Sequence, residues 1–404
     1  MAERYPGGVI SKTPPVVTGP TGGEGGSASG MWTLDTVLEY EKAGAWPTPP
    51  LPRPLYAWGS NGSGQLGLND LQPRSSPVQV GALTTWEQVA GGATFSAAIK
   101  TDGTLWAWGF NGSGQIGDNT IVSKSSPVQV GALTNWLQVA AGNFFAVATK
   151  ADGTLWAWGL NTQGQLGDGS VVARSSPVQI GALSIWSQVS AGGSHAVAVG
   201  SSGSLWAWGK NTNGELGQGN VIFRSSPVQI GALTTWSKTS ATRDGTSAIK
   251  NDGTLWTWGQ NAFGQLGHNN TIYRSSPVQV GALTNWSEVA GGVNNFAAVK
   301  TDNTLWAWGD GDSGRLGDNT IVNRSSPVQI GSLTTWSKIG AGLATCFAIK
   351  TDRTLWAWGA NSTGQVGDGT VIRRSSPVQI GMLTTWYEVS RGPGSEHTVA
   401  ITKG

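Results

Sequence analysis

Leu105-Trp106-Ala107-Trp108-Gly109 is one of seven near-identical segments that decide the fold of this chain. Most of the others repeat the same five residues, and two are the close variants Leu-Tyr-Ala-Trp-Gly and Leu-Trp-Thr-Trp-Gly. The segments begin, 50 residues apart, at Leu55, Leu105, Leu155, Leu205, Leu255, Leu305 and Leu355. A period of about 20 to 50 residues is typical of solenoids and propellers, in which each repeat is one structural unit.

Each repeat is expected to contain four short strands. In one repeat these are Pro77–Val80, Trp86–Ala90, Phe95–Lys100 and Thr104–Trp108. Asp102-Gly103 is a hairpin-turn signal because glycine accepts positive φ; Asn303 and Arg353 replace this glycine later, so those turns are expected to differ or carry strain. The unbroken apolar run in the fourth strand indicates a sheet buried on both faces, as in a propeller blade.

The two ends of the repeat region complement each other. The first copy supplies only a fourth strand, starting at Leu55, and the last copy ends with three strands after His397–Lys403. We therefore expect an all-β, seven-bladed β-propeller of four-stranded antiparallel blades, in which the N-terminal strand completes the C-terminal blade. Such closure leaves no blade edge unpaired. The expected domains are an arm, 1–54, and the propeller, 55–404.

The repeat resembles the RCC1 repeat over about residues 55–404. The similarity rests on Gly-x-Leu-Trp-Ala-Trp-Gly-x-Asn-x-x-Gly-Gln-Leu-Gly and on Ala-Gly-Gly-Ser-His195-Ala-Val-Ala. The resemblance implies a seven-bladed propeller whose relatives act as exchange factors for a small GTPase, as chromatin binders or, in bacteria, as inhibitors that cap an enzyme. The chain departs from the family pattern at the histidine, which survives only at His195 and His397.

Composition argues against several classes of partner. Charged residues make up 12% of the chain and the net charge is +2, whereas nucleic-acid binding needs clustered Lys and Arg. Residues 1–30 carry no net charge, so no basic chromatin-binding tail is expected. No stretch approaches the ~20 apolar residues of a membrane span, and the N-terminus has no signal-peptide pattern. We expect synthesis in a cytoplasm, no membrane insertion and a buried, unpaired Cys346.

No catalytic, metal or cofactor site is expected. Gly62-Ser-Gly-Gln-Leu-Gly67 matches a dinucleotide-binding pattern but recurs in blade loops. Asp310-Gly-Asp-Ser-Gly314 lacks the remaining ligands of a calcium loop, and the three histidines lack metal-ligand spacing. A basic residue precedes each Ser-Ser-Pro and is expected to pair locally: Arg74, Lys124, Arg174, Arg224, Arg274, Arg324 and Arg374.

The copies differ mainly in three loops, and these differences suggest a binding face. One loop follows the second strand, another follows Trp-Gly (Phe110, Lys210, Gln260, Asp310), and the third precedes the basic residue (Phe223, Tyr273, Arg373). We expect residues of the first loop to form a composite surface at one end of the ring: Phe95, Phe144, Phe145, His195, Arg243, Asp244, Asn294, Asn295 and His397. Five of them, Phe144, Phe145, Arg243, Asp244 and His397, are expected to be solvent-accessible together. Neutral drift at exposed loops is the alternative.

Residues 1–54 differ in composition from the repeats. The segment 11–30 is rich in Pro, Thr, Gly and Ser and is expected to be extended; residues 33–43 are expected to form a short helix with Thr33 as N-cap and Gly44 after its end. The arm resembles segments of structural proteins of tailed bacteriophages, especially marine and cyanobacterial ones, through Trp32-Thr-Leu34 and Gly44-Ala-Trp46-Pro47. The resemblance implies an anchor formed by Tyr5, Trp32, Leu34, Val37, Leu38 and Trp46. A disordered leader whose helix packs on its own propeller is the alternative.

Together these features suggest a non-enzymatic binding protein. The first hypothesis is a virion-associated protein, made in the host cytoplasm. Its arm binds other virion proteins or a second copy, and its propeller is displayed toward a host-surface glycan or protein. The second is a bacterial module that caps a protein partner with one face of the ring.

Overall fold

The computed structural model describes residues 4–5, 8–9 and 51–404, in two compact units, Met1–Leu51 and Pro52–Gly404. In the first unit, β1 (Arg4–Tyr5) pairs antiparallel with β2 (Gly8–Val9). The expected strap 11–30 and helix 33–43 lie outside the described residues.

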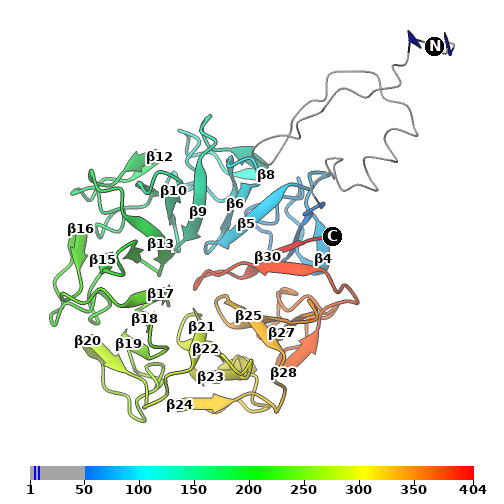
Figure 1. The fold of residues 1–404 in the computed structure, drawn as a ribbon. Coiled ribbons are helices and arrows are strands. Elements are labelled where there is room, and N and C mark those ends of the chain that lie inside the picture. Colours follow the sequence, from blue (N-terminus) through cyan, green and yellow to red (C-terminus); the bar gives the residue numbers. More distant parts are fainter. Residues whose placement is uncertain (1–3, 6–7, 10–50) are drawn as a thin grey trace. The chain divides into compact units, whose positions relative to one another are not determined.

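The second unit is a ring of seven four-stranded antiparallel sheets (Figure 1). One blade contains β5 (Trp86–Gly91), β6 (Phe95–Lys100), β7 (Leu105–Gly109) and β8 (Lys124–Gln129), paired in that order. The following blades are β9 (Trp136–Ala141), β10 (Phe145–Lys150), β11 (Leu155–Gly159), β12 (Arg174–Gln179); β13 (Trp186–Ala191), β14 (His195–Gly200), β15 (Leu205–Gly209), β16 (Arg224–Gln229); β17 (Trp236–Ala241), β18 (Gly245–Lys250), β19 (Leu255–Gly259), β20 (Arg274–Gln279); β21 (Trp286–Gly291), β22 (Asn295–Lys300), β23 (Leu305–Gly309), β24 (Arg324–Gln329); and β25 (Trp336–Ala341), β26 (Thr345–Lys350), β27 (Leu355–Gly359), β28 (Arg374–Gln379). A 3-10 turn, η1 (Asp312–Gly314), follows β23.

The last blade confirms the predicted closure. It has the order β29 (Trp386–Val389), β30 (His397–Thr402), β3 (Leu55–Gly59), β4 (Arg74–Gln79), so one strand from the start of the ring pairs with two different parts of the chain. In the β3–β30 ladder, Gly59 stands opposite His397. The chain enters and leaves the ring within this blade (Figure 1).

Residues before Leu55 also form hydrogen bonds with the ring. The Gly404 N–H donates to the Pro52 carbonyl at 3.1 Å, the Arg53 N–H donates to Thr84 at 2.7 Å, and the Arg53 carbonyl accepts from Trp86 N–H at 3.2 Å. Arg53 therefore takes the place that Gly103 occupies in the hairpin turn one repeat later, where the Gly103 carbonyl accepts from Trp136 N–H. The break between the chain ends coincides with one of these turns.

The strand positions explain two features of the sequence. The outer strands begin about three residues earlier than predicted, at Arg74 and its equivalents, which places Pro77 inside a strand. Proline lacks an N–H and is tolerated there because the outer strand has a neighbour on one side only. At the predicted irregular turns, Asn303 and Arg353 have φ of 60° and 62°, so they adopt the left-handed conformation that glycine holds in the other turns.

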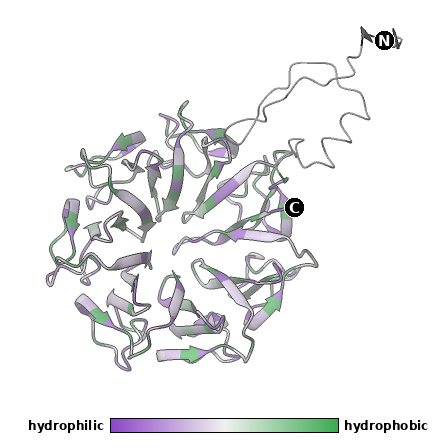
Figure 2. Ribbon diagram, in the orientation of Figure 1, coloured by the Kyte–Doolittle hydropathy of each residue, from purple (hydrophilic) through white to green (hydrophobic). Residues whose placement is uncertain are grey.

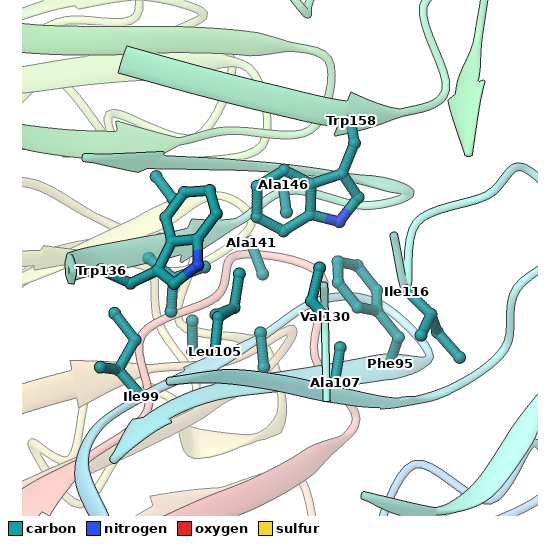
Figure 3. Close-up of a cluster of buried hydrophobic side chains, with 14 residues drawn as sticks. Phe95, Ile99, Leu105, Ala107, Ile116, Val130, Trp136, Ala141, Ala146 and Trp158 are labelled. Carbon is teal, nitrogen blue, oxygen red and sulfur yellow. The ribbon is translucent and has the colours of Figure 1, made fainter. Parts of the chain in front are cut away.

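Tryptophans fill the space between blades. In the cluster of Figure 3, Trp136 and Trp158 pack with Leu105, Phe95 and Ile116 from the preceding blade. The Trp158 indole N–H donates at 2.9 Å to the Gln115 carbonyl of that blade, so the ring is both buried and hydrogen-bonded. Burial of one such side chain contributes up to about 5 kcal/mol before entropy.

A lysine covers an indole pair in five blades. Lys100 Nζ, for example, lies 3.7 Å from the Trp106 ring centroid and 5.2 Å from that of Trp86. The blade with Gly200 lacks this lysine, and there Ile185 replaces the Thr or Asn of the other copies and packs on the same core. The loss of the cation is thus accompanied by an apolar replacement.

The basic residues before Ser-Ser-Pro pair locally, as predicted, in five of seven copies. Arg174 contacts Asp168 at 2.9 Å, and Lys124, Arg324 and Arg374 have the equivalent aspartate. Arg74 pairs instead with Asp70, because Leu68 occupies the equivalent position. In the remaining two copies, Gln218 and His268 stand where the aspartate would be, opposite Arg224 and Arg274.

Candidate functional site

The two ends of the ring differ in construction. Loops such as 92–94, between the first two strands of a blade, and 110–123, between the last two, leave the blades at the same end, which we call the loop face. The opposite end, the turn face, carries the hairpin turns such as 101–104 and the segments such as 81–85. The segments of the turn face are almost identical in sequence from blade to blade, whereas those of the loop face differ.

A narrow cavity of about 280 Å³ lies along the ring axis between the first strands of the blades. Three of the side chains that line it are glutamines bonded to the main chain of the next blade; Gln88, for example, donates to the Val139 carbonyl and accepts from its N–H, both at 2.9 Å. The equivalent positions in four other blades are charged: Lys238, Glu288, Lys338 and Glu388. Hydrophilic residues accordingly mark the strands around the opening in Figure 2.

Arg391 closes part of this cavity. Its loop is longer than the others, since His397 lies eleven positions after Trp386 but Thr345 lies nine positions after Trp336. The guanidinium reaches past one whole blade and donates to Glu288 at 3.0 Å. Burial opposes ionisation of Glu288, but Arg391 and Lys238 beside it hold the pKa of this carboxyl below its usual value. The charged side chains that line this part of the cavity thus form ion pairs with one another.

The predicted composite face is wrong in its central expectation. Three of the five residues expected to be solvent-accessible are buried: Phe145, Asp244 and His397. Phe95, His195 and Asn295 of the same face are buried as well. Phe144, Arg243 and Asn294 are partly exposed. Of the predicted anchor, the side chains of Tyr5, Trp32, Leu34, Val37, Leu38 and Trp46 lie outside the described structure.

The buried positions vary because each one faces a partner in the next blade. His195 Nε2 lies 3.0 Å from Thr246 Oγ1, Asn295 Nδ2 lies 3.3 Å from Cys346 Sγ, and His397 Nε2 lies 2.6 Å from Ser96 Oγ. We call the boundary between two neighbouring blades a seam. At two other seams the corresponding residues are Phe95 with Ala146 and Phe145 with Ala196, and each pair lies within one hydrophobic cluster. Large side chains stand opposite alanine and histidines stand opposite hydroxyls, so the variation is matched between neighbours.

Burial sets the ionisation of these groups. It lowers the pKa of His195 to about 4 and that of His397 to about 3, so both imidazoles are neutral at pH 7. Burial also raises the pKa of the Cys346 thiol to about 11. A neutral histidine with a hydroxyl partner and a protonated, enclosed thiol are structural groups rather than acid–base or nucleophilic ones.

A second set of variable residues meets at the loop-face end of each seam. Three positions form a seam trio: the residue after Trp-Gly, the residue five positions later, and the residue before the second strand of the next blade. The seven trios are Ser60/Gln65/Thr94, Phe110/Gln115/Phe144, Leu160/Gln165/Ser194, Lys210/Glu215/Asp244, Gln260/Gln265/Asn294, Asp310/Arg315/Ala344 and Ala360/Gln365/Glu396.

Within most trios the first two residues are chemically matched. Gln65 Nε2 lies 3.4 Å from Ser60 Oγ, Gln265 Nε2 lies 3.4 Å from Gln260 Oε1, and the Arg315 guanidinium lies 2.9 Å from the Asp310 carboxylate. The charged trio at Lys210 adds a third member, since its ammonium contacts Glu215 at 3.5 Å and Asp244 at 2.5 Å.

The ionisable groups of the charged trio shift in different directions. Burial opposes ionisation of Asp244, but the bond from Lys210 outweighs it and holds the Asp244 pKa below its usual value. Burial raises the pKa of Glu215.

Two neighbouring trios lack this match because their first residue, Phe110 or Leu160, is apolar. Phe110 and Phe144 lie edge to face with centroids 6.1 Å apart, and the Leu160 N–H bonds the Phe144 carbonyl at 2.8 Å, so the three residues are contiguous. Phe110 is 36% exposed, and Phe144 and Leu160 are partly exposed. The amide nitrogens of Gln115 and Gln165 are buried and have no hydrogen-bond partner among the described residues. We call Phe110, Phe144 and Leu160 the apolar patch.

The outer rim carries a different, repetitive apolar surface. The tips of the loops between the third and fourth strands expose aliphatic side chains, such as Ile121 and Val122, in all seven copies at similar sequence positions. Phe223 and Tyr273 add aromatic side chains in two of them. Because this surface recurs around the ring, it distinguishes one blade from another less than the loop face does.

No group of three or more His, Cys, Asp or Glu residues in 51–404 is arranged to hold a metal ion. Within the described part of the chain, no helix is long and apolar enough to span a membrane.

Sequence reasoning missed Gln115 and Gln165 and did not pair Phe110 with Phe144. A usable signal was present, because the copies vary jointly: an acidic residue at 244 accompanies the cation at 210, and Arg315 accompanies Asp310. Comparing positions with those of the next copy, rather than each position alone, would have found these seams.

The repeat profile described as "Regulator of chromosome condensation (RCC1) repeat" matches seven times, at residues 54–99, 102–149, 152–199, 202–249, 252–299, 302–349 and 353–401. A second profile of the same description matches residues 86–115, 136–165 and 186–215. No similar sequence was found among the curated proteins.

Several solved structures share the fold. Prp20p from Saccharomyces cerevisiae, described with its binding to Gsp1p and histones, is 20% identical, with a TM-score of 0.77 over 88% of this chain and 93% of that one. Human WBSCR16 is 21% identical, with a TM-score of 0.77 over 87% and 99%. Yeast RCC1 (Prp20) bound to Kap60 is 19% identical, with a TM-score of 0.78 over 98% and 96%. At these identities the likeness establishes the architecture.

Proposed function

Because this chain belongs to the RCC1 repeat family, we propose that it is a non-catalytic binding protein that docks a protein partner on its loop face. The observation that carries the proposal is the asymmetry of that face. The turn face repeats nearly the same residues in every blade, but the partly exposed loop-face positions change from aromatic at Phe110 to cationic at Lys210. A partner without sevenfold symmetry can be oriented only by a surface of this kind.

Two further observations support binding over catalysis. His195, His397 and Cys346 are enclosed and paired with neighbouring blades, and charges that line the axial cavity satisfy one another. Among relatives, the yeast protein is described as binding Gsp1p and histones and was solved bound to Kap60, all of which are protein or protein-containing partners.

The finer proposal concerns location. Residues 1–54 would anchor the chain to a tailed-phage particle through other virion proteins or a second copy, and the propeller would be displayed for a host-surface glycan or protein. The support lies in the sequence: the Gly/Ser-rich strap and the Trp32-Thr-Leu34 and Gly44-Ala-Trp46-Pro47 motifs. A bacterial module that caps a protein partner uses the same loop face and needs no anchor.

Particle incorporation tests the finer proposal. A chain starting at Pro52 keeps the contacts of Arg53 and Gly404 and should remain a folded propeller. It should be missing from purified particles, whereas residues 1–51 fused to an unrelated soluble domain should be incorporated. Equal incorporation of the truncated and full chains would contradict the anchor. Capsid or tail genes next to the gene for this chain would favour the phage particle over the bacterial module.

The loop-face proposal has its own test. Cysteine substitutions at Gly62 and Thr162, exposed on the loop face, and at Ala82 and Ala182, exposed on the turn face, would carry a photo-crosslinker. We expect the two loop-face variants to crosslink to a protein partner and the two turn-face variants to give no crosslink. Crosslinks confined to the turn face would contradict the proposal.

A further inference from the structure

We propose that the apolar patch of Phe110, Phe144 and Leu160 is the anchor point of the loop face, and that it takes an uncharged protein segment carrying one apolar side chain beside a main-chain carbonyl. The inference deepens the proposed function and rests on it. It names the part of the loop face that binds and the chemistry of the segment that is bound.

The first observation is the exposure of a contiguous apolar group. The Phe110 and Phe144 rings lie edge to face at 6.1 Å, and Leu160 is joined to Phe144 through a main-chain hydrogen bond of 2.8 Å. The Phe110 ring lies against Gly112, where a Cβ atom would approach its Cζ to 2.5 Å, so the ring rests on its own loop. Partly exposed, rigidly held aromatic side chains are typical centres of binding energy in protein interfaces.

The second observation is independent and concerns the amides below the patch. In the seams of Ser60 and Gln260, the residue after Trp-Gly accepts from the glutamine amide. Phe110 and Leu160 occupy the same positions and offer no acceptor, so the Nε2 groups of Gln115 and Gln165 are fully buried and unpartnered among the described residues. A buried amide without a hydrogen bond is destabilising, because its desolvation is not compensated. An acceptor brought by a ligand would recover this energy.

The charges of the surrounding trios define the occupant. Across the seams of Phe110 and Leu160 no member is charged, whereas the next seam holds Lys210, Glu215 and Asp244 in mutual contact. A charged segment would gain no partner over the patch and would lose hydration there. A protein segment with an apolar side chain and a carbonyl supplies both the contact area and the acceptor.

A glycan fits less well. Each of its hydroxyl groups needs a hydrogen-bond partner, and the patch itself presents three apolar side chains. The two rings also pack edge to face, an arrangement that does not present them as one flat stacking surface.

The repeats provide variants that remove the patch without harming the fold. Phe110→Ser copies the Ser60/Gln65 seam, and Leu160→Gln copies the Gln260/Gln265 seam, so both supply the missing acceptor. We expect the double variant to melt at or above the temperature of the parent. Ala360→Ser introduces the same acceptor at the distant Gln365 seam and is the matched control.

The test uses the full chain and a library of displayed random dodecapeptides. We expect the selected peptides to carry one large apolar residue and no net charge. The double variant should bind them at least tenfold more weakly, a loss of about 1.4 kcal/mol, and the control should bind as the parent does. In the complex, the side-chain amide resonances of Gln115 and Gln165 should shift.

Other outcomes would overturn the inference in distinguishable ways. Peptides that bind the double variant as tightly as the parent but are lost in Arg243→Ala would leave the loop face as the binding surface and exclude the patch. Peptides that map to the turn face would count against both proposals. Binding of neutral oligosaccharides that depends on Phe110, with no selected peptide, would replace the protein segment by a glycan.

Discussion

His397 Nε2 lies 2.6 Å from Ser96 Oγ, although 301 positions separate the two residues, and this contact joins the last blade of the ring to the first. The same kind of contact links His195 to Thr246, whereas the seams of Phe95 and Phe145 have alanine opposite the ring. Each seam therefore has its own matched pair at a position that is otherwise equivalent in all blades.

The first prediction is that these pairs are energetically coupled. Ser96→Ala leaves His397 Nε2 without its partner and should lower the free energy of unfolding by about 1–3 kcal/mol. His397→Phe alone should be destabilising because the ring meets the Ser96 hydroxyl. The double variant copies Phe95 with Ala146 and should return to within about 1 kcal/mol of the parent in urea denaturation.

The matched control moves the pair in the opposite direction. Phe95→His should be destabilising alone and should recover when Ala146→Ser supplies the hydroxyl. If the costs of the single changes simply add in both double variants, the pairing has no energetic meaning.

The second prediction concerns pH. Burial lowers the pKa of His195 to about 4 and of His397 to about 3, while the unfolded chain protonates histidine near 6.5. Between about pH 6 and 4 the unfolded state binds protons that the folded state excludes, so stability falls as the pH falls. Each histidine contributes about 1.4 kcal/mol per pH unit in this window.

Thermal melting from pH 7 to 4.5 would measure this slope. Burial also lowers the pKa of His268, so all three histidines act in the same direction. Replacing His195 and His397 together by Gln should flatten the profile above pH 4.5, before the aspartates protonate. An unchanged slope in that variant would contradict the assignment.

The third prediction uses the ion pair of one seam trio. Asp310→Ala removes the carboxylate that lies 2.9 Å from the Arg315 guanidinium, which is 9% exposed, and leaves only the exposed Asp312 carboxylate at 3.7 Å. We expect the free energy of unfolding to fall by about 3 kcal/mol, the lower end for a broken buried pair. Adding Arg315→Gln recreates the Ala360/Gln365 trio and should restore most of the stability, as measured by urea denaturation; failure of this rescue would show that the trios are not interchangeable units.

The fourth prediction concerns closure. Removing Leu55–Gly59 deletes β3 and leaves β30 and β4 without the strand that lies between them, so melting should become less cooperative and solubility should fall. A circular permutant is the control: joining Gly404 to Pro52 and opening the chain between Asp252 and Gly253 moves the break to an equivalent turn. It should melt within a few degrees of the 52–404 ring. A deletion variant that melts like the parent would contradict the shared-blade closure.

The fold could be predicted from the sequence because the information is local and repeated. The predicted third strand, Phe95–Lys100, agrees with β6, and the split between Leu55 and His397 located the shared blade correctly. The outer strand differs, because Pro77 predicts a strand start but lies inside β4. The missing N–H of proline is equally harmless within a strand that has a neighbour on one side only.

The site was harder to predict for a physical reason. The burial of Phe145 or His195 depends on the next blade, whose covering residues lie about 50 positions away. The sequence of one loop alone therefore does not show that its side chains are covered. Variation was therefore interpreted as exposure, whereas here it reflects matching between neighbours. Phe144, beside the buried Phe145, was included correctly among the partly exposed residues, but its contact with Phe110 is also formed across a seam.

The paired seams also bear on how such a gene can change over generations. Recombination between near-identical repeats removes or adds whole 50-residue units, and gene conversion overwrites one repeat with its neighbour. Loss of the unit 186–235 would place Phe145 opposite Thr246 in place of Ala196, a buried mismatch at the new seam. The few differences between copies thus select against both the loss of a repeat and its replacement by a neighbouring repeat. As a result, the order of the blades around an otherwise uniform ring is kept from one generation to the next.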